Sequence, residues 1–195
     1  ESIKKREIFP AIGAAELQNL ANTYNRVYLE NQETQKLICH QAEHDALTEA
    51  LNRGSYEKLL HIYETGDALF ALILIDVDIF KSVNDIYGHA VGDAILQKVT
   101  GSLKKAFRSI DYVCRIGGDE FLVLIPGITE NLFQSMIRSM LVDMAKSSVH
   151  LALGSVWVDD CTGKVEKSLS EADVRMYEDK RAYYAKNRQL DRRRH

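Results

Sequence analysis

The sequence predicts an α/β domain in which helices flank a mainly antiparallel central sheet, with a long helix at the N-terminus. An apolar run of strand length covers residues 68–75. A second run at 121–125 forms a β-hairpin with residues 112–113 across a Gly-Gly turn. Helical periodicity extends over residues 94–107 and 129–145. Together these patterns favour one sheet covered by helices.

Composition limits the kind of protein. A chain of 195 residues can hold one domain with a sizeable core and an extension. The net charge of −3 gives no basic field, so polymeric DNA or RNA is not expected as a partner. The three cysteines, Cys39, Cys114 and Cys161, lack metal-site spacing and suit a reducing compartment, which predicts a cytoplasmic location.

The ends of the chain suggest a piece of a larger protein. No apolar run approaches the roughly 20 residues of a spanning helix, so we expect no membrane segment in this fragment. The sequence begins at Glu1 rather than at methionine, which is typical of a fragment. We expect it to belong to a longer sensor protein, and membrane attachment of that protein is left open.

The first predicted element is a single helix over residues 14–44, a stretch without glycine or proline. Apolar residues from Leu17 recur at three- and four-residue steps, as in a heptad seam that turns polar after Val27. Two interpretations stay open for residues 1–43. They form a linker that dimerises as a coiled coil, or a helix that packs on its own domain.

A turn and a short helix over residues 45–60 come next, with Asn52 at a break or cap. The strand at 68–75 is almost unbroken in its apolar character, which indicates a central strand covered on both faces. This strand delivers Asp76 and Asp78 to its C-terminal end, where ligands usually bind in α/β sheets.

Residues 79–93 are dense in polar side chains. Lys81 lies just beyond the acidic strand end and could balance phosphate charge. Asn84 and Asp93 together offer donors and acceptors that match the edge of guanine. Asp93 is also expected to cap the amphipathic helix at 94–107.

The hairpin turn combines two glycines with two acids. Gly117 and Gly118 admit positive φ and let a ligand approach the backbone. Asp119 and Glu120 follow at the mouth of the hairpin, where buried carboxylates are costly unless a cation meets them. If the hairpin lies beside the central strand, Asp76 and Asp119 can share a divalent ion such as Mg²⁺. The alternative is that both acidic pairs are solvated strand ends.

The C-terminal part contributes three more elements. The helix at 129–145 carries methionines that we interpret as core filler. A strand is expected at 150–158, with Trp157 packed at its end. The last helix is expected to open at Ser170, where Ser170 and Asp173 form a capping-box pattern.

These motifs resemble a GGDEF domain, the diguanylate cyclase family. The resemblance covers roughly residues 44 to 186, and its motifs occur in the order of the family. They are Asp45-Ala46-Leu47-Thr48 with Asn52-Arg53, Asp76 to Lys81, Asn84 to His89 with Gly92-Asp93, Gly117 to Phe121, and Ala172-Asp173 with Met176-Tyr177 and Lys180. The resemblance implies a palm-like, nucleotidyl-cyclase-like architecture, with a catalytic domain over residues 44–188 and a tail over 189–195.

The resemblance also implies an activity and a site. A diguanylate cyclase condenses two GTP into cyclic di-GMP and two pyrophosphates, at the interface of a homodimer formed through the N-terminal helix and the active-site faces. The implied cofactor is Mg²⁺, with Mn²⁺ as an alternative. The implied ligands are Asp76, the Val77 carbonyl and Asp119, and Glu120 assists a second ion or the attacking hydroxyl. The implied substrate-binding residues are Lys81, Asn84, Asp93, Gly117, Gly118 and Lys180.

Two further features concern regulation and activity. Arg108 and Asp111 match the family's inhibitory product site, to which we add Arg138; the alternative is a surface ion pair. The family's Gly-Arg pair, whose arginine contacts phosphate, is replaced here by Tyr183-Tyr184. This departure supports an alternative function, a catalytically inactive module that binds GTP or cyclic di-GMP and regulates a partner. Glu49 also departs from a family glycine and is expected to alter only a loop.

Overall fold

The computed structural model describes residues 14–66, 69–144, 150–159 and 164–186. Cys161 and the tail at 189–195 lie outside these ranges. The chain divides into two units, Glu1–Glu43 and His44–His195. In the first unit the predicted helix is present as α1 (Ala15–Glu43), none of whose residues is buried. None of the helices in the described ranges has both the length and the apolar character needed to cross a membrane.

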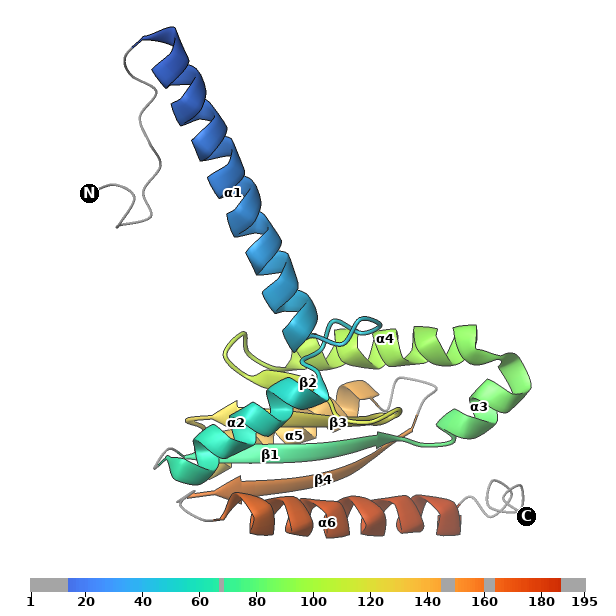
Figure 1. Cartoon of the computed structure of the whole chain (residues 1–195). Coiled ribbons are helices and arrows are strands. Elements are labelled where there is room, and N and C mark those ends of the chain that lie inside the picture. The colour runs from blue at the N-terminus through green and yellow to red at the C-terminus, as the bar shows by residue number, and fades with distance from the viewer. Residues whose placement is uncertain (1–13, 67–68, 145–149, 160–163, 187–195) are drawn as a thin grey trace. The chain divides into compact units, whose positions relative to one another are not determined.

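The second unit is built on a four-stranded antiparallel sheet with strand order β2-β3-β1-β4 (Figure 1). The strands are β1 (Phe70–Val77), β2 (Tyr112–Arg115), β3 (Glu120–Pro126) and β4 (Leu151–Val158). The predicted hairpin is present, because β2 pairs with β3 in a register that sets Arg115 opposite Phe121. The predicted α/β class with a mainly antiparallel sheet is confirmed.

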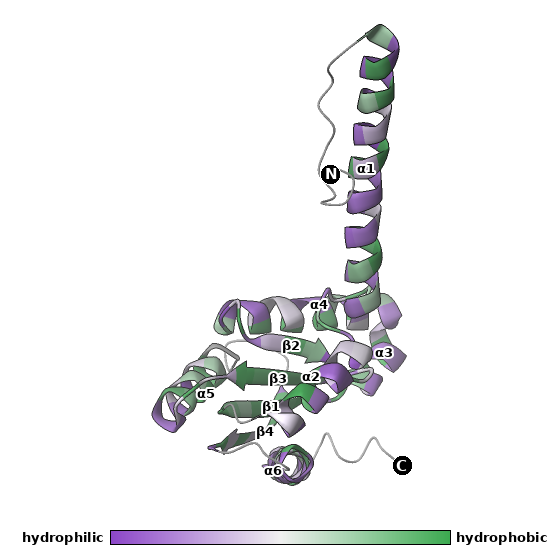
Figure 2. Ribbon diagram, turned by 60° about the vertical axis from the view of Figure 1, so that its left-hand side comes forward, coloured by the Kyte–Doolittle hydropathy of each residue, from purple (hydrophilic) through white to green (hydrophobic). Residues whose placement is uncertain are grey.

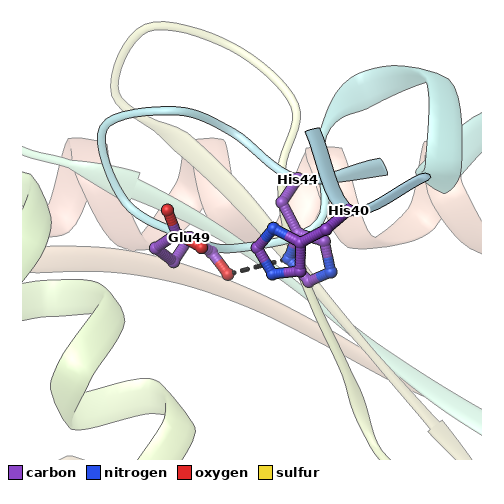
Figure 3. A group of neighbouring side chains, drawn as sticks. All are labelled: His40, His44 and Glu49. Carbon is purple, nitrogen blue, oxygen red and sulfur yellow. Dashed lines mark hydrogen bonds between the residues drawn. The ribbon is translucent and has the colours of Figure 1, made fainter. Parts of the chain in front are cut away.

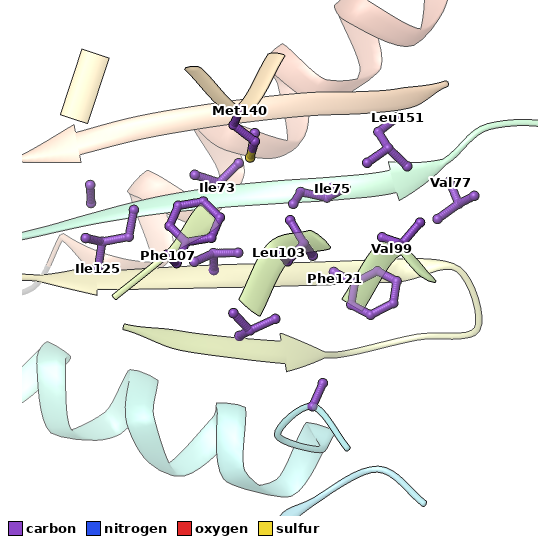
Figure 4. Close-up of a cluster of buried hydrophobic side chains, with 14 of the residues drawn as sticks. Ile73, Ile75, Val77, Val99, Leu103, Phe107, Phe121, Ile125, Met140 and Leu151 are labelled. Carbon is purple, nitrogen blue, oxygen red and sulfur yellow. The ribbon is translucent and has the colours of Figure 1, made fainter. Parts of the chain in front are cut away.

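Helices cover both faces of this sheet. The helices are α2 (Arg53–Thr65), α3 (Phe80–Tyr87), α4 (His89–Ala106), α5 (Glu130–Met144) and α6 (Val165–Lys186). Residues of α4 and α5 pack with one set of β1 side chains, including Ile73 and Ile75 (Figure 4). Residues of α2 and α6 pack with the alternate set, including Leu72 and Leu74. Since successive strand residues point to opposite faces, a strand covered on both faces needs apolar residues at consecutive positions, and β1 has them from Phe70 to Ile75. Figure 2 shows the visible parts of β1 and β3 mainly in the green of hydrophobic residues. Asp76, near the end of β1, is its one charged residue.

Helix starts differ from the predicted ones in two places. Helix α4 begins at His89 after Gly88, whose φ of +83° separates it from α3, so Asp93 lies inside the helix and does not cap it. Helix α6 begins at Val165, before the predicted capping box at Ser170. Its first turn is capped from another element, because the Glu64 carboxylate accepts the Val165 N–H at 3.1 Å. A tertiary contact therefore sets this boundary.

Asn52 and Trp157 behave as expected. The Asn52 side chain accepts the Ser55 N–H at 3.0 Å and caps α2. The Trp157 indole N–H donates to the Ile128 carbonyl at 2.7 Å while the ring packs against the core.

The backbone conformation at Glu49 is one that glycine adopts more easily than other residues. Its φ is +58°, a left-handed conformation that is unfavourable for a residue with a Cβ. The Glu49 carbonyl accepts hydrogen bonds from His44 Nδ1 at 3.1 Å (Figure 3) and from Lys104 Nζ at 2.5 Å. These two donors hold the strained turn in place.

Replacing Glu49 with glycine is expected to stabilise the domain by about 0.5–1 kcal/mol, because the backbone strain is relieved and the two carbonyl hydrogen bonds are kept. Thermal unfolding followed by circular dichroism should show a rise in Tm of about 1–4 °C. The matched control is Glu57→Gly inside α2, which should lower Tm because glycine weakens a helix. A lower Tm for Glu49→Gly would show that the Glu49 side chain contributes more than its backbone costs.

Candidate active site

The acidic ends of β1 and the hairpin meet in space. Asp76 is buried at the end of β1 and lies opposite Glu120 of β3 in the strand register. The Val77 N–H donates to the Asp119 carbonyl at 3.0 Å, so the turn is anchored beside the strand end. Glu120 is exposed. The structure therefore brings together the four residues proposed as metal ligands.

The charges at this end of the sheet are unevenly balanced. Burial, followed by the negative charge of Asp76, raises the pKa of Asp119. Lys180 of α6 forms an ion pair with Asp76, with 2.6 Å between Nζ and Oδ1. Burial lowers the pKa of Lys180, but the hydrogen bond and charge of Asp76 outweigh burial and raise it. One ammonium facing several carboxylates leaves negative charge, which suits a divalent cation.

The hairpin turn is braced by residues that precede α2. The Arg115 guanidinium donates to the Gly118 carbonyl at 2.8 Å and to Asp45 Oδ1 at 2.9 Å. Burial raises the pKa of Asp45, but hydrogen bonds from Thr48 and Arg115 outweigh it and lower that pKa. Sequence reasoning gave Asp45 no role. Its place in a family motif was the only signal, and its partner is remote in the chain.

Gly117 and Gly118 do not adopt the positive φ that glycine admits, so the space around each residue decides what its position tolerates. A Cβ built on Gly117 would lie 2.5 Å from Glu120 Oε2. The Glu120 side chain thus folds back over the turn, and any larger residue at Gly117 would displace it. Gly118 has open space around it, which leaves its backbone accessible.

The second group of predicted residues lies at the corner between α3 and α4. Asn84 Oδ1 is buried and, within the described part of the chain, has no hydrogen-bond partner. Gly92 of α4 makes room for it, because a Cβ there would lie 1.9 Å from Asn84 Oδ1. Asp93 follows Gly92 and is exposed, as is Lys81 in the first turn of α3. A buried acceptor without a partner costs about 1–3 kcal/mol, so Asn84 marks a position where a ligand donor is expected.

A group that sequence analysis missed surrounds Asp78. His150 Nδ1 donates to Asp78 Oδ2 at 2.6 Å, and the Tyr183 ring stacks on the imidazole with 3.6 Å between centroids. Tyr184 meets Tyr183 edge-on at 5.7 Å. Burial raises the pKa of Asp78, although His150 and Lys180 act in the opposite direction. Tyr183, the first of the two tyrosines that replace the family's Gly-Arg pair, therefore covers the imidazole that is hydrogen-bonded to Asp78.

Arg108 and Asp111 lie together at the other end of the hairpin. Arg108 Nη2 donates to Asp111 Oδ1 at 2.8 Å and to the Pro126 carbonyl at 2.9 Å. The hydrogen bond that Arg108 donates to Asp111 raises the pKa of Arg108. A cavity of about 420 Å³ beside the pair is also lined by Lys104 and Tyr112. Arg138 is exposed on α5, and within the described ranges no hydrogen bond or ion pair joins it to either residue.

A few carboxylates beside a lysine at one strand end are side chains that can bind a divalent cation together with a phosphorylated ligand. The chain belongs to the GGDEF family, because the family model described as "Diguanylate cyclase, GGDEF domain" matches residues 42–186. The resemblance stated from the motifs is thereby confirmed.

Individual relatives agree with this assignment. The probable diguanylate cyclase DgcE of Escherichia coli K12 is 34% identical over 164 residues, which cover 77% of this chain and 15% of that protein. Diguanylate cyclase TpbB of Pseudomonas aeruginosa is 32% identical over 193 residues, which cover 88% of this chain and 44% of that protein. The chain thus spans less than half the length of these relatives.

Solved structures give the same fold. A microbial GGDEF domain whose interaction with cyclic di-GMP has been described superposes with a TM-score of 0.63 at 28% identity. The match covers 74% of this chain and 94% of that one.

Proposed function

We propose that this domain is a diguanylate cyclase that joins two GTP into 3′,5′-cyclic di-GMP and releases two pyrophosphates. The observation that carries the proposal is the junction of Asp76, Asp119 and Lys180 at one strand end, with 2.6 Å between Lys180 Nζ and Asp76 Oδ1. The names of the relatives support the family activity.

The reaction consists of two equal steps. In each step the 3′-hydroxyl of one guanosine unit attacks the α-phosphorus of the other, so the first step joins the two GTP and the second closes the ring. A new P–O bond forms, the bond from the α-phosphorus to the oxygen bridging the β-phosphate breaks, and pyrophosphate leaves. The hydroxyl proton passes to a nearby carboxylate or to water. Because each domain would hold one GTP, two domains must face each other in a homodimer.

The acidic residues would prepare the α-phosphate for attack. Asp76, the Val77 carbonyl and Asp119 would hold Mg²⁺, or Mn²⁺, and Glu120 would assist a second ion or the attacking hydroxyl. Bound there, the ion would stabilise the negative charge that develops on the transferring phosphate. The raised pKa of Asp119 supports this assignment, since a nearby cation would offset the charge of Asp76.

The remaining residues would bind and orient the nucleotide. Lys81 and Lys180 would neutralise the charge that develops on pyrophosphate. Asn84 and Asp93 would read the guanine edge, with the unpartnered Asn84 oxygen accepting a base N–H. Gly117 and Gly118 would let the backbone approach the ribose and the phosphates. These residues are the ones to substitute first.

The direct test is product formation from GTP and Mg²⁺, measured by chromatography over a range of protein concentrations. We expect cyclic di-GMP at a rate that rises more than linearly with protein, because the active form is a dimer. Absence of product at every concentration, while GTP still binds, would contradict the proposal.

A second candidate function is a catalytically inactive GGDEF module that binds GTP or cyclic di-GMP and regulates a partner. Tyr184 favours it, since it stands where the family carries a phosphate-binding arginine. The two candidates differ in one variant. If the module is inactive only for lack of that charge, Tyr184→Arg combined with Tyr183→Gly should create turnover.

Replacing Gly92 with alanine is expected to weaken GTP binding about tenfold, because the new Cβ would displace the Asn84 side chain. Titration of a fluorescent GTP analogue gives the dissociation constant. The matched control is Gly101→Ala in the same helix, where nothing lies within 4 Å of the added Cβ. An unchanged dissociation constant for Gly92→Ala would remove Asn84 from the nucleotide site.

Replacing Arg108 with alanine is expected to raise the inhibition constant for cyclic di-GMP by about tenfold or more, because bidentate arginine contacts contribute about 1–3 kcal/mol. Initial rates at increasing product concentration measure this constant. Arg53→Ala, which removes an exposed arginine paired with Glu57, serves as the control. Equal inhibition of the variant and the wild type would reduce the Arg108–Asp111 pair to a structural contact.

A further inference from the structure

Lys180 lies between two carboxylates and donates a hydrogen bond to only one of them. Its ammonium is 2.6 Å from Asp76 Oδ1 and 4.0 Å from Asp78 Oδ1. The Asp78 side chain is 0% exposed, and its Oδ1 has no hydrogen-bond partner within the described residues. A fully buried carboxylate oxygen without a partner destabilises the folded protein. This oxygen is therefore free to accept a hydrogen bond from a nearby donor.

The Asp78 carboxylate is held so that this oxygen stays near Lys180. Its other oxygen, Oδ2, accepts the His150 Nδ1–H at 2.6 Å. The backbone N–H of Asp78 donates to the His150 carbonyl at 3.1 Å. Tyr183 stacks on the imidazole at an interplanar angle of 16° and restricts the ring. Two hydrogen bonds and a stacked ring thus prevent Asp78 from turning away.

Lys180 competes with any cation for Asp76. In the proposed function, on which this inference rests, Asp76 is a ligand of a divalent ion. An ammonium and a dication attached to the same carboxylate repel each other, and the interaction is strong where water is excluded. Binding of the ion therefore requires Lys180 to release Asp76.

We propose that Asp78 is a positioning residue that receives Lys180 when a divalent cation occupies Asp76. The exchange needs a movement of only about 1 Å, from 4.0 Å to the usual length of a charge-assisted hydrogen bond. Asp78 then offsets the repulsion between the ammonium and the ion, and Lys180 stays in the site, available to the phosphates. Without Asp78, Lys180 would remain on Asp76 or leave the site.

The test is a double-mutant cycle in the affinity for Mn²⁺ alone, read by electron paramagnetic resonance of the free ion. Asp78→Asn should weaken Mn²⁺ binding about tenfold, since Lys180 loses its second acceptor, and Lys180→Met should tighten it. In the Lys180→Met background, Asp78→Asn should change the affinity by at most about threefold. The asparagine keeps an acceptor for His150.

Two outcomes would overturn the inference, and they differ in whether the proposed metal site survives. Equal weakening by Asp78→Asn in both backgrounds would mean that Asp78 acts on the ion directly through its charge, and the proposed metal site would stand. No Mn²⁺ binding by the wild type or any variant would remove the metal site itself, together with this inference.

A structural measurement decides the question even if Asp78→Asn does not fold. A crystal structure of the wild-type chain with Mn²⁺ should place Lys180 Nζ within about 3 Å of Asp78 Oδ1. Nζ still on Asp76, or turned into solvent, would show that no exchange occurs.

Discussion

Replacing Asp119 with asparagine is expected to lower cyclic di-GMP formation about 1,000-fold or more while the domain stays folded. Only the charge changes, because the contact that anchors the turn is made by the Asp119 backbone carbonyl to the Val77 N–H. A lost metal-ligand charge removes several kcal/mol of transition-state stabilisation, which corresponds to this loss in rate. Chromatography of the reaction at saturating GTP and Mg²⁺ measures the effect.

The same variant is expected to be more stable than the wild type in metal-free buffer at pH 7. Burial and the charge of Asp76 raise the pKa of Asp119. A carboxyl with a raised folded-state pKa stabilises the fold below its unfolded pKa of about 3.9, and this stability is lost as pH rises through the folded pKa. Asparagine avoids that loss, so the difference in Tm should be present at pH 7 and disappear as the pH falls below about 3.9.

Magnesium should reverse this order. The ion stabilises only the form that binds it, so Mg²⁺ should raise the Tm of the wild type and leave Asp119→Asn unchanged. Asp159→Asn is the matched control, because its side chain is 72% exposed. Turnover of Asp119→Asn comparable to that of the wild type would exclude Asp119 from the mechanism.

Replacing Gly154 with alanine is expected to destabilise the domain by about 3 kcal/mol, which would lower Tm by about 6–12 °C. Gly154 lies in β4 where α6 crosses it. A Cβ there would lie 1.8 Å from the Ala172 carbonyl oxygen and 2.7 Å from the Met176 nitrogen, both in the α6 backbone. Backbone atoms inside a helix cannot move aside singly, so the whole helix would have to shift.

A shift of α6 would also move Lys180 in the proposed site, because Lys180 belongs to this helix. Any Gly154→Ala protein that still folds should therefore bind Mn²⁺ with altered affinity. Gly101→Ala in α4 is the control and should raise stability by about 0.5–1 kcal/mol. A Tm for Gly154→Ala equal to that of the wild type would show that β4 and α6 adjust easily.

The sequence by itself determined the central sheet and the acidic strand end. Residues 70–75 had to be apolar on both faces, and the glycine turn before Asp119 had to close a hairpin. Both patterns are local consequences of burial and backbone geometry, so they can be read without a structure. The motifs at Asp76, Asn84 and Gly117 then indicated the family, which the comparison confirmed.

Only the tertiary structure decided how these groups are coupled. The cap that starts α6 comes from Glu64, and Asp78 is held by His150 under Tyr183. Each contact joins segments far apart in the chain, and no local pattern signals it. The balance of charge around Lys180 depends on the distances from its ammonium to the neighbouring carboxylates and on the exclusion of water from them. Both are set only when the chain folds.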